Sequence, residues 1–277
     1  MPGGLYYNSN GFAFHRIEDA ARILADLGYD GLALTPDVHH LDPFHATSDQ
    51  VDAFRALCEE LGLGLVLETG ARFVLDPRRK HRPSLLDEAD DAKVRLDFLM
   101  RCVDQAERLG APVVTVWSGN GPDDTPEDIL RLRLVEGLTR LCDYAEARGV
   151  RIGFEPEPGM WIETAAQYIA IRDGVDHPAL GLTLDVGHCL ATGEGAPEDV
   201  LRAHAHDLLV VQLDDHVSGV HDHLMFGDGA IDFGRIGEAV SDIGFDGPLE
   251  VELSRHSATA ADTAAASIAF LRAHFGG

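Results

Sequence analysis

Acidic and imidazole side chains stand at the ends of apolar, strand-like runs in this chain. The clearest run is 182–188, in which aliphatic residues lead to Asp185, and His188 follows three positions later. A carboxylate at the end of a buried strand is costly unless something pairs with it, and a metal ion is a common partner. Taken alone, Asp185 has a second interpretation, as the cap of a following helix.

The same arrangement recurs at three further runs, which end in Glu155, Gln212, Asp214, Asp215, Glu250 and Glu252. Glu250 and Glu252 point to the same side of a strand, and Glu252 lies nearer its end, so we assign Glu252 to the site. Carboxylates combined with a neutral oxygen or an imidazole form a hard, oxygen-rich site. Such a site suits Mg²⁺, Mn²⁺ or a similar divalent ion.

These side chains need a scaffold that brings distant strand ends together. Strand-like and helix-like patterns alternate eight times, with strands expected at 5–7, 31–35, 63–68, 113–117, 150–155, 180–185, 208–213 and 248–253. Helices are expected at 16–27, 48–61, 88–109, 126–148, 164–173, 197–206, 232–243 and 258–274. The pattern predicts an α/β protein, a single (β/α)8 TIM barrel over residues 1–277, whose strand ends open on one face. An open doubly wound sheet is the alternative, but no G-x-G-x-x-G motif follows the first strand.

Charge and composition limit the partners. The 47 acidic residues outnumber the 22 lysines and arginines, which gives a formal charge of −25. This charge repels nucleic acid and anionic lipid surfaces. No stretch reads as a signal peptide or a membrane-spanning helix. We therefore expect a cytoplasmic protein with neither nucleic-acid nor membrane partners, and a homo-oligomer remains possible.

The long connection at 69–87 concentrates positive charge in this acidic chain, with Arg72, Arg78, Arg79, Lys80, His81 and Arg82. One interpretation is a solvated surface loop, and the other is a lid that meets an anionic substrate. Gly227 and Gly229 have two interpretations as well, a phosphate-binding loop or a turn into the next helix. We favour the turn, because Asp228 between the glycines opposes an anion.

The second half of the chain resembles a known family. The motifs that carry the resemblance lie between about 150 and 253 and are Phe154-Glu155, Leu184-Asp185-x-Gly-His188, Gln212-Leu-Asp-Asp215, the stretch from His221 to Asp232, and Gly247 to Glu252. They are similar to the xylose-isomerase-like TIM barrel superfamily of sugar phosphate isomerases and epimerases. The resemblance implies one divalent ion, Mn, Mg, Co or Zn, bound by Glu155, Asp185, Gln212 and Glu252. Glutamine as the third ligand resembles the hydroxypyruvate-isomerase branch.

The chemistry implied is proton transfer on a small hydroxy-carbonyl compound. A divalent ion that binds the carbonyl and hydroxyl oxygens acidifies the C–H bond between them. Glu155 and Glu252 are the pair expected to remove and return the proton through a metal-bound enediolate. By resemblance, His188 would bond to a substrate oxygen; otherwise it satisfies backbone groups in its turn.

Substrate contacts are also expected from His223, Trp117 and Arg72. His223 has alternative interpretations as an exposed loop residue or as a ligand of a second metal together with His221. For Trp117 the alternative is simple packing.

These features lead to a metal-dependent isomerase or epimerase that acts on a small sugar, a sugar phosphate or a hydroxy-keto acid. One alternative is a dehydratase of a keto-polyol on the same site, and another is a catalytically silent metal-binding scaffold. Relatives with a trinuclear zinc site cut abasic DNA, and His39, His221 and His223 offer some of the extra ligands. Gln212, Asp222 and the charge of −25 disfavour that reading.

Overall fold

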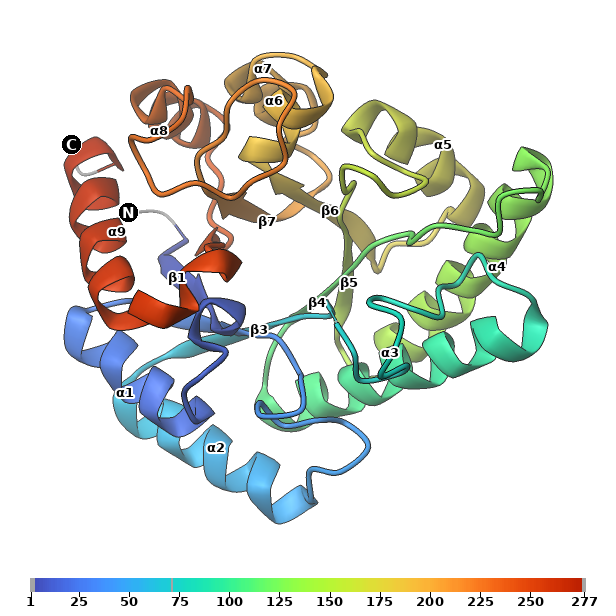
Figure 1. The fold of residues 1–277 in the computed structure, drawn as a ribbon, viewed down its shortest axis with the longest axis horizontal. Helices are drawn as coiled ribbons and strands as arrows, with labels where there is room; N and C mark the ends of the chain where they lie inside the picture. The colour runs from blue at the N-terminus through green and yellow to red at the C-terminus, as the bar shows by residue number, and fades with distance from the viewer. Residues whose placement is uncertain (1–2, 71, 276–277) are drawn as a thin grey trace.

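The strands form a closed barrel in the computed structural model, which describes residues 3–70 and 72–275 (Figure 1). Within these residues the strands are β1 (Leu5–Asn8), β2 (Gly31–Leu34), β3 (Gly64–Glu68), β4 (Val113–Val116), β5 (Arg151–Phe154), β6 (Leu180–Asp185), β7 (Leu208–Leu213) and β8 (Leu249–Val251). Each strand pairs in parallel with the next, and β8 pairs with β1. The predicted (β/α)8 barrel is confirmed.

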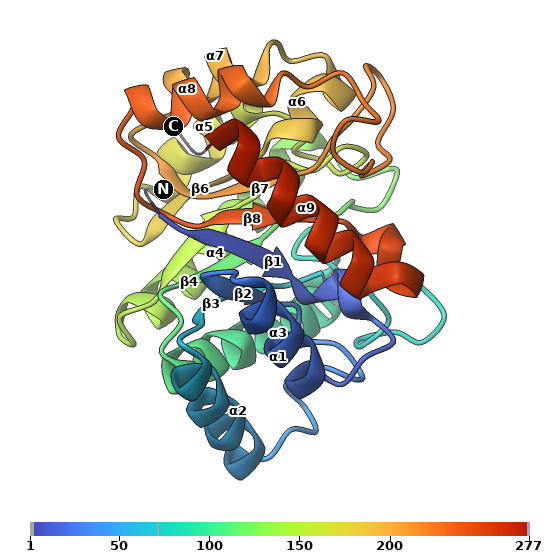
Figure 2. The same ribbon diagram turned by 90° about the vertical axis from the view of Figure 1, so that its left-hand side faces the viewer.

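Helices surround the barrel. They are α1 (Ile17–Leu27), α2 (Ser48–Leu61), α3 (Ala89–Leu109), α4 (Glu127–Glu146), α5 (Ala165–Val175), α6 (Val186–Thr192), α7 (Pro197–Ala203), α8 (Phe233–Asp242) and α9 (Ala260–Phe275). Helix α9 packs between α1 and α8 and closes the outer ring (Figure 2). Among the described residues, no helix is both long and apolar enough to span a membrane.

Short helical segments at the carboxyl ends of strands were not predicted as elements. The 3-10 helices η1 (Ser9–Phe12) and η2 (Ser254–Thr259) follow β1 and β8 and contact each other, and α6 follows β6 directly. These segments are too short to show a helical hydrophobic period in the sequence. They matter for function because they start where the strands end, beside the predicted site.

Aliphatic side chains of the strands and helices form the main core between the two layers. Inside the barrel, the Tyr6 side chain of β1 lies against Gly31 of β2 and reaches Gly64 of β3. A Cβ atom at Gly31 would come within 2.1 Å of the Tyr6 ring, and one at Gly64 within 2.2 Å of the Tyr6 hydroxyl. These glycines therefore make room for an aromatic ring in the barrel interior, below the polar strand ends.

Candidate metal centre and substrate cavity

A cavity of about 220 Å³ opens at the carboxyl ends of the strands. Loops that follow strands in both halves of the chain contribute to its wall. Five of the residues predicted from the sequence line it, namely Arg72, Trp117, Glu155, His223 and Glu252. The topology therefore gathers these five residues from positions up to 180 apart in the sequence.

Asp185 and Gln212 lie deeper and form part of the barrel itself. They face each other as register partners on β6 and β7, and both side chains are fully buried. One carboxylate oxygen of Asp185 lies within 4.8 Å of ligand atoms of His223 and Glu252. The structure thus brings Asp185 to Glu252, one of the predicted ligands from the cavity wall.

The two oxygens of Asp185 have different environments. Oδ1 accepts hydrogen bonds from the backbone N–H groups of Gly187 (2.6 Å) and His188 (3.1 Å), which caps the start of α6. Oδ2 is buried and has no hydrogen-bond partner in the part of the chain that the structure describes. Both interpretations of Asp185 therefore apply, because one oxygen caps a helix while the other remains available to a ligand.

Gln212 is fully buried, and its Oε1 atom has no hydrogen-bond partner among the described residues. Its amide group lies beside the Glu250 carboxyl and acts to lower the pKa of that carboxyl, which burial raises. Leaving buried polar atoms unpaired is costly, and native structures rarely do so without a reason. An amide oxygen is a suitable ligand for a divalent ion. The two unpaired atoms, Gln212 Oε1 and Asp185 Oδ2, therefore fit a bound cation.

The raised pKa values of the buried carboxyl groups also fit a bound cation. Burial, with the neighbouring Asp214 charge, raises the pKa of Asp185 to about 8. Burial and then the charges of Glu157 and Glu252 raise the pKa of Glu155 well above its usual value. Clustered buried carboxylates repel one another unless a cation balances them. The donor set has the charge and the oxygen atoms that a divalent ion requires.

Glu250 lies below the site, as its position two residues before Glu252 predicts. Its Oε1 atom accepts a hydrogen bond from Asn8 Nδ2 (2.8 Å) inside the barrel. Glu252 instead lines the cavity, and its Oε1 atom accepts a hydrogen bond from Asn10 Nδ2 (2.9 Å). The geometry agrees with the choice of Glu252 as the residue that faces a ligand.

His188 projects from α6 into this cluster. Its Nδ1 atom donates to the carbonyl oxygen of Pro156 (3.1 Å), and within residues 3–70 and 72–275 its buried Nε2 atom has no hydrogen-bond partner. Burial, with the nearby His221 and His223, holds the pKa of His188 well below its usual value. A neutral ring that donates from Nδ1 carries a lone pair on Nε2, so His188 can accept a hydrogen bond or bind a metal.

Four residues near the site were not assigned to it from the sequence: Glu68, Glu157, Asp214 and His216. Asp214 Oδ1 accepts from His216 Nδ1 (3.0 Å), and Asp214 Oδ2 accepts from His223 Nδ1. Burial alone would raise the pKa of Asp214, but these two histidines hold it below its usual value. Asp214 and Glu68 stand at or just after strand ends, the signal that identified Asp185. Glu157 and His216 lie in loops a few residues after strands. The sequence there has no periodic pattern of apolar residues that would identify them.

The loop 214–232 is fixed to β7 through Asp215. The backbones of Asp215 and Leu224 exchange two hydrogen bonds, at 3.1 and 2.7 Å. The Asp215 carboxylate accepts from the N–H groups of Gly227 (2.9 Å), Gly229 (3.0 Å) and Ile231 (3.1 Å). These glycine amides bind a carboxylate of the chain itself, which supports the turn rather than the phosphate-binding interpretation.

Only part of the basic segment at 69–87 faces the cavity. Arg72, Lys80 and His81 line it. Arg79 instead pairs with Asp76 (2.6 Å), and Arg82 donates to the carbonyl oxygen of Asn120. The structure therefore does not bring the whole run of arginines to the cavity.

Arg95 of α3 holds this loop in place. Its side chain is buried and donates to the carbonyl oxygens of Pro83 (2.8 Å) and His81 (2.9 Å). Its guanidinium group lies 4.7 Å from the centre of the Trp117 ring, and His81 packs edge-on against the same ring. The loop, the aromatic wall and α3 thus form one packed unit beside the cavity.

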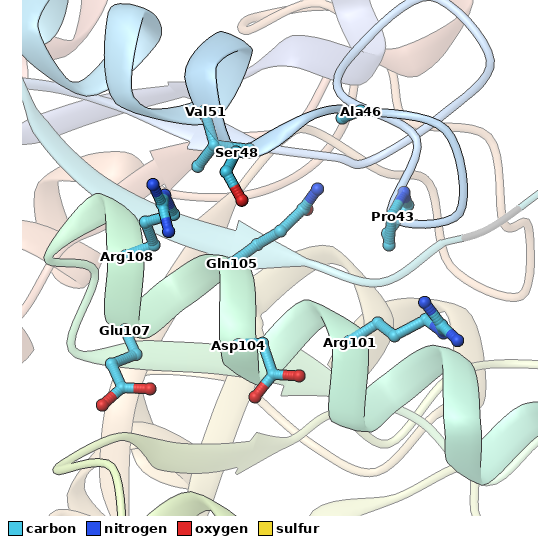
Figure 3. A pocket seen from close by; sticks show the side chains of 9 residues that line it. All are labelled: Pro43, Ala46, Ser48, Val51, Arg101, Asp104, Gln105, Glu107 and Arg108. Atoms are coloured by element: carbon cyan, nitrogen blue, oxygen red, sulfur yellow. The ribbon is translucent and has the colours of Figure 1, made fainter.

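Other hollows on the surface differ from the main cavity. A groove of about 430 Å³ between α2 and α3 is lined by Val51, Arg101, Gln105 and Arg108 (Figure 3). Arg108 there pairs with the exposed Asp52 (2.5 Å). His39, considered as an extra metal ligand, lines a hollow next to Val38 and Phe73 and is absent from the wall of the main cavity. Neither hollow brings together several buried carboxyl groups as the main cavity does.

A family model described as xylose isomerase-like TIM barrel matches residues 21–274. The chain belongs to this family. The match covers both halves of the chain, whereas the motifs in the sequence covered only its second half. The predicted family is confirmed.

Several proteins of known sequence or structure are similar to this member of the xylose isomerase-like family. A 3-dehydroshikimate dehydratase of Pseudomonas putida is 28% identical over 249 residues, which are 87% of this chain and 36% of the dehydratase. An L-ribulose-5-phosphate 3-epimerase of Salmonella typhi is 26% identical over 191 residues, 68% of this chain and 66% of the epimerase. The chain thus spans little more than a third of the dehydratase.

The fold is also similar to a solved structure, that of the IOLI protein with a bound zinc atom. The TM-score is 0.79 at 20% identity, and the match covers 99% of this chain and 100% of the other. This similarity shows that the whole barrel is shared.

Proposed function

We propose that this protein is a divalent-metal-dependent isomerase or epimerase of a small hydroxy-carbonyl compound. The observation that carries the proposal is that Asp185 Oδ2 and Gln212 Oε1 are buried with no hydrogen-bond partner among the described residues. A carboxylate oxygen of Asp185 lies within 4.8 Å of one of Glu252, and Glu155 and Glu252 line the same cavity. The similarity to an epimerase supports the same reaction class. In this proposal Glu155, Asp185, Gln212 and Glu252 hold the ion, which would be Mn²⁺, Mg²⁺, Co²⁺ or Zn²⁺.

The ion supplies Lewis acidity, which makes the C–H bond beside a substrate carbonyl more acidic. Glu155 follows β5 and Glu252 follows β8, so the two carboxylates reach the cavity from different parts of the barrel wall. One of them accepts the proton from carbon and the other returns a proton to the resulting enediolate. Asn10 orients Glu252 through its hydrogen bond of 2.9 Å.

His188 and Trp117 complete the proposed substrate site. The neutral His188 ring accepts a hydrogen bond from a substrate hydroxyl through Nε2, and its Nδ1 bond to Pro156 fixes this tautomer. Trp117 forms an apolar part of the wall, which excludes water from the reacting carbon. In this proposal His223 also contacts the substrate.

The charge at the cavity indicates the kind of substrate. Arg72, Lys80 and Arg255 line the cavity together with the carboxyl groups. Cations around a space of about 220 Å³ favour a small compound with an anionic group, either a sugar phosphate or a hydroxy-keto acid. Arg255 already pairs with Asp222, so Arg72 and Lys80 are the cations that a substrate anion would meet.

A dehydratase is the second candidate, and Glu68 is the observation that favours it. Glu68 lines the cavity at the end of β3, and burial together with the charge of Glu252 raises its pKa above the usual value. A carboxyl group that keeps its proton at neutral pH can donate it to a leaving hydroxyl group. The similarity to a dehydratase over 87% of this chain is consistent with this candidate.

One experiment separates these reactions. The metal-loaded protein is incubated in deuterated water with ketoses, ketose phosphates and hydroxy-keto acids, and the products are analysed by mass spectrometry. Isomerisation or epimerisation adds deuterium without loss of water, whereas dehydration removes one water and creates a conjugated carbonyl chromophore. Glu252→Gln should abolish deuterium incorporation while leaving the fold. Turnover by this variant, or metal binding without any turnover of the wild type, would contradict the proposal, and the latter would support a scaffold.

A further inference from the structure

Glu250 is a buried carboxyl group that the proposed reaction does not use. It is the register partner of Gln212 on β7 and β8, and Gln212 is in turn the register partner of Asp185 on β6 and β7. All three side chains are buried. Register partners on neighbouring strands point to the same side of the sheet. The three residues therefore form one row inside the barrel, with the Gln212 amide between two carboxyl groups.

Asn8, at the end of β1, determines which oxygen of Glu250 is available. The backbone N–H of Asn10 donates to Asn8 Oδ1 (2.9 Å). A backbone N–H group only donates, so Oδ1 is the oxygen of the Asn8 amide, and the Asn8 Nδ2 group donates to Glu250 Oε1 (2.8 Å). Glu250 Oε2 is buried and has no hydrogen-bond partner among the described residues. This second oxygen is therefore free to accept from the neighbouring Gln212 amide.

The amide of Gln212 has a donor end and an acceptor end of nearly the same shape, and only one of them suits a metal ion. Burial and then the charge of Glu252 raise the pKa of Glu250, whereas the Asn8 and Gln212 amides act to lower it. A neighbour that lowers the pKa of a carboxyl group favours its charged form, as an N–H donor does. The N–H end of Gln212 is therefore the end beside Glu250. The carbonyl oxygen, Oε1, is left at the other end of the amide.

We propose that Glu250 is a positioning residue, which binds the N–H end of the Gln212 amide and so directs Gln212 Oε1 to the metal ion. The inference rests on the proposed function, because it concerns the ion of the oxygen-rich site (Glu155, Asp185, Gln212 and Glu252). Glu250 acts through Gln212 and is not itself a ligand. Groups that hold a ligand in this way contribute strongly to metal affinity.

A carboxylate is the side chain that this position requires. Its two oxygens accept from two donors at once, one from Asn8 and one from Gln212. A glutamine of the same size has one acceptor oxygen, and its N–H end would face a second donor. Glu250→Gln should therefore turn the Gln212 amide over, so that Gln212 presents its N–H end, which cannot bind an ion, to the metal position.

Metal affinity, measured without any substrate, tests this proposal. The metal-free full-length protein is titrated with Mn²⁺ in a calorimeter, and circular dichroism verifies the fold of each variant. Glu250→Gln should weaken Mn²⁺ binding at least about tenfold. Glu68→Gln is the matched control, because it also removes one buried carboxyl group beside the cavity. If Glu250→Gln weakens binding no more than Glu68→Gln does, the effect is one of charge alone and the proposal is overturned.

Exchanging the two side chains provides a rescue that a merely structural role would not give. In the double variant Glu250→Gln, Gln212→Glu, the amide at 250 accepts from Asn8 and donates to the carboxylate at 212, whose other oxygen faces the ion. Mn²⁺ affinity should return at least to the wild-type value. Gln212→Glu alone should bind more weakly than the double variant, because two carboxyl groups then meet with no donor between them.

The outcomes separate this inference from the proposed function. A double variant that binds no better than Glu250→Gln would overturn the positioning role. Wild-type protein that binds Mn²⁺, with the same affinity in Glu250→Gln, would overturn the inference and leave the proposed function standing. Wild-type protein that binds no divalent ion would overturn both.

Discussion

Gln212 is a buried residue whose Oε1 atom has no partner within the described protein. We expect Gln212→Leu to weaken metal binding at the oxygen-rich site at least about tenfold, since it removes a proposed ligand. The same change should alter the stability of the metal-free protein by less than about 1 kcal/mol, because it removes the unpaired Oε1 atom but also the amide group beside the Glu250 carboxyl. Thermal unfolding with and without a chelator measures both effects. Gln212→His, which keeps a ligand atom, serves as the control, and equal metal affinity in Gln212→Leu would exclude Gln212 as a ligand.

Asp185 has two separable roles, one for each carboxylate oxygen. Asp185→Asn keeps an oxygen that can cap α6 but removes the charge, so it should lose the metal and retain most of its stability. Asp185→Ala should lose the metal and about 1 kcal/mol more, because the cap is lost as well. Chemical unfolding of both variants in chelator, beside metal analysis, tests the difference. Equal stabilities would show that capping by Asp185 contributes nothing.

For single residues, the sequence predicted which polar side chains stand at the ends of strands. It did not predict the hydrogen-bond partners of these side chains. Glu155, Asp185, Gln212 and Glu252 were found because each follows an apolar run. The pairing of Asp214 with His216 and His223 was not predictable, because it depends on the path of a loop that has no periodic pattern. The free and bonded oxygens of Asp185 were likewise visible only in three dimensions.

The loop 69–87 and helix α3 act together through Arg95. Arg95→Lys keeps the charge but cannot donate to both the His81 and Pro83 carbonyl groups in the same geometry. We expect faster proteolysis within 69–87 and a higher KM, with unchanged metal content. Limited proteolysis and kinetics check this expectation. Arg101→Lys, on the exposed side of α3, is the matched control, and identical cleavage of both variants would disprove a role of Arg95 in holding the loop.

The strands and the longer helices were predicted well, because their periodic pattern of apolar residues extends over many positions. Glycines mark the ends of several helices. Gly28, Gly62 and Gly110 end α1, α2 and α3 in the left-handed conformation, directly after the predicted helix ends at 27, 61 and 109. Helix α6 was not predicted, because its seven residues include a glycine and lie directly after the strand. Its start depends on the Asp185 cap, a local contact over two to three residues.

For the whole molecule, the buried ionisable groups predict an unusual response to pH. Burial raises the pKa of Asp185 in the folded state to about 8, far above its usual value of 3.8, so between these values the folded state binds more protons than the unfolded state. Asp214, despite burial, raises the pKa of His223 to about 10, which acts in the same direction. Stability of the metal-free protein should therefore fall as pH rises from about 5 to about 8.

Denaturant unfolding at several pH values in chelator measures this trend. Saturating divalent metal should reverse it, because the ion binds the deprotonated carboxylates and competes with protons at low pH. Asp185→Asn should show a shallower decline in the metal-free state, since one of the contributing groups no longer titrates. A metal-free protein that gains stability between pH 5 and pH 8 would contradict the expected protonation of the site.

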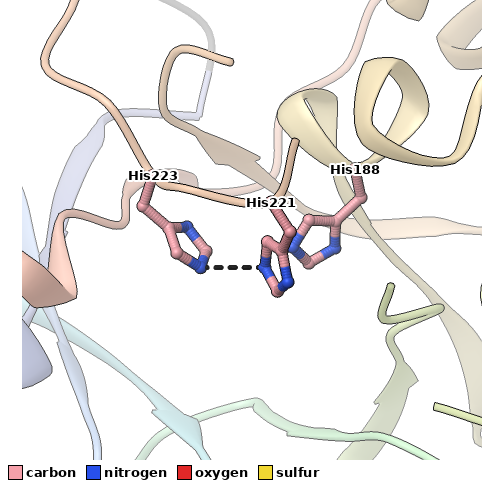
Figure 4. Close-up of side chains that lie close together, drawn as sticks. All are labelled: His188, His221 and His223. Carbon is pink, nitrogen blue, oxygen red and sulfur yellow. Dashed lines mark hydrogen bonds between the residues drawn. The ribbon is translucent and has the colours of Figure 1, made fainter. Parts of the chain in front are cut away.

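The attachment of the loop 214–232 to β7 has a consequence for how a ligand binds. Asp215 holds both arms of this loop, through Leu224 and through the amides of Gly227, Gly229 and Ile231. His221 and His223, which line the cavity and lie side by side (Figure 4), are thus held in place before a ligand enters, and little conformational entropy is lost on binding. Such preorganisation means that a ligand can enter and leave without refolding of the loop. Amide hydrogen exchange in 216–231 should accordingly be slow in the ligand-free protein and should change little on binding.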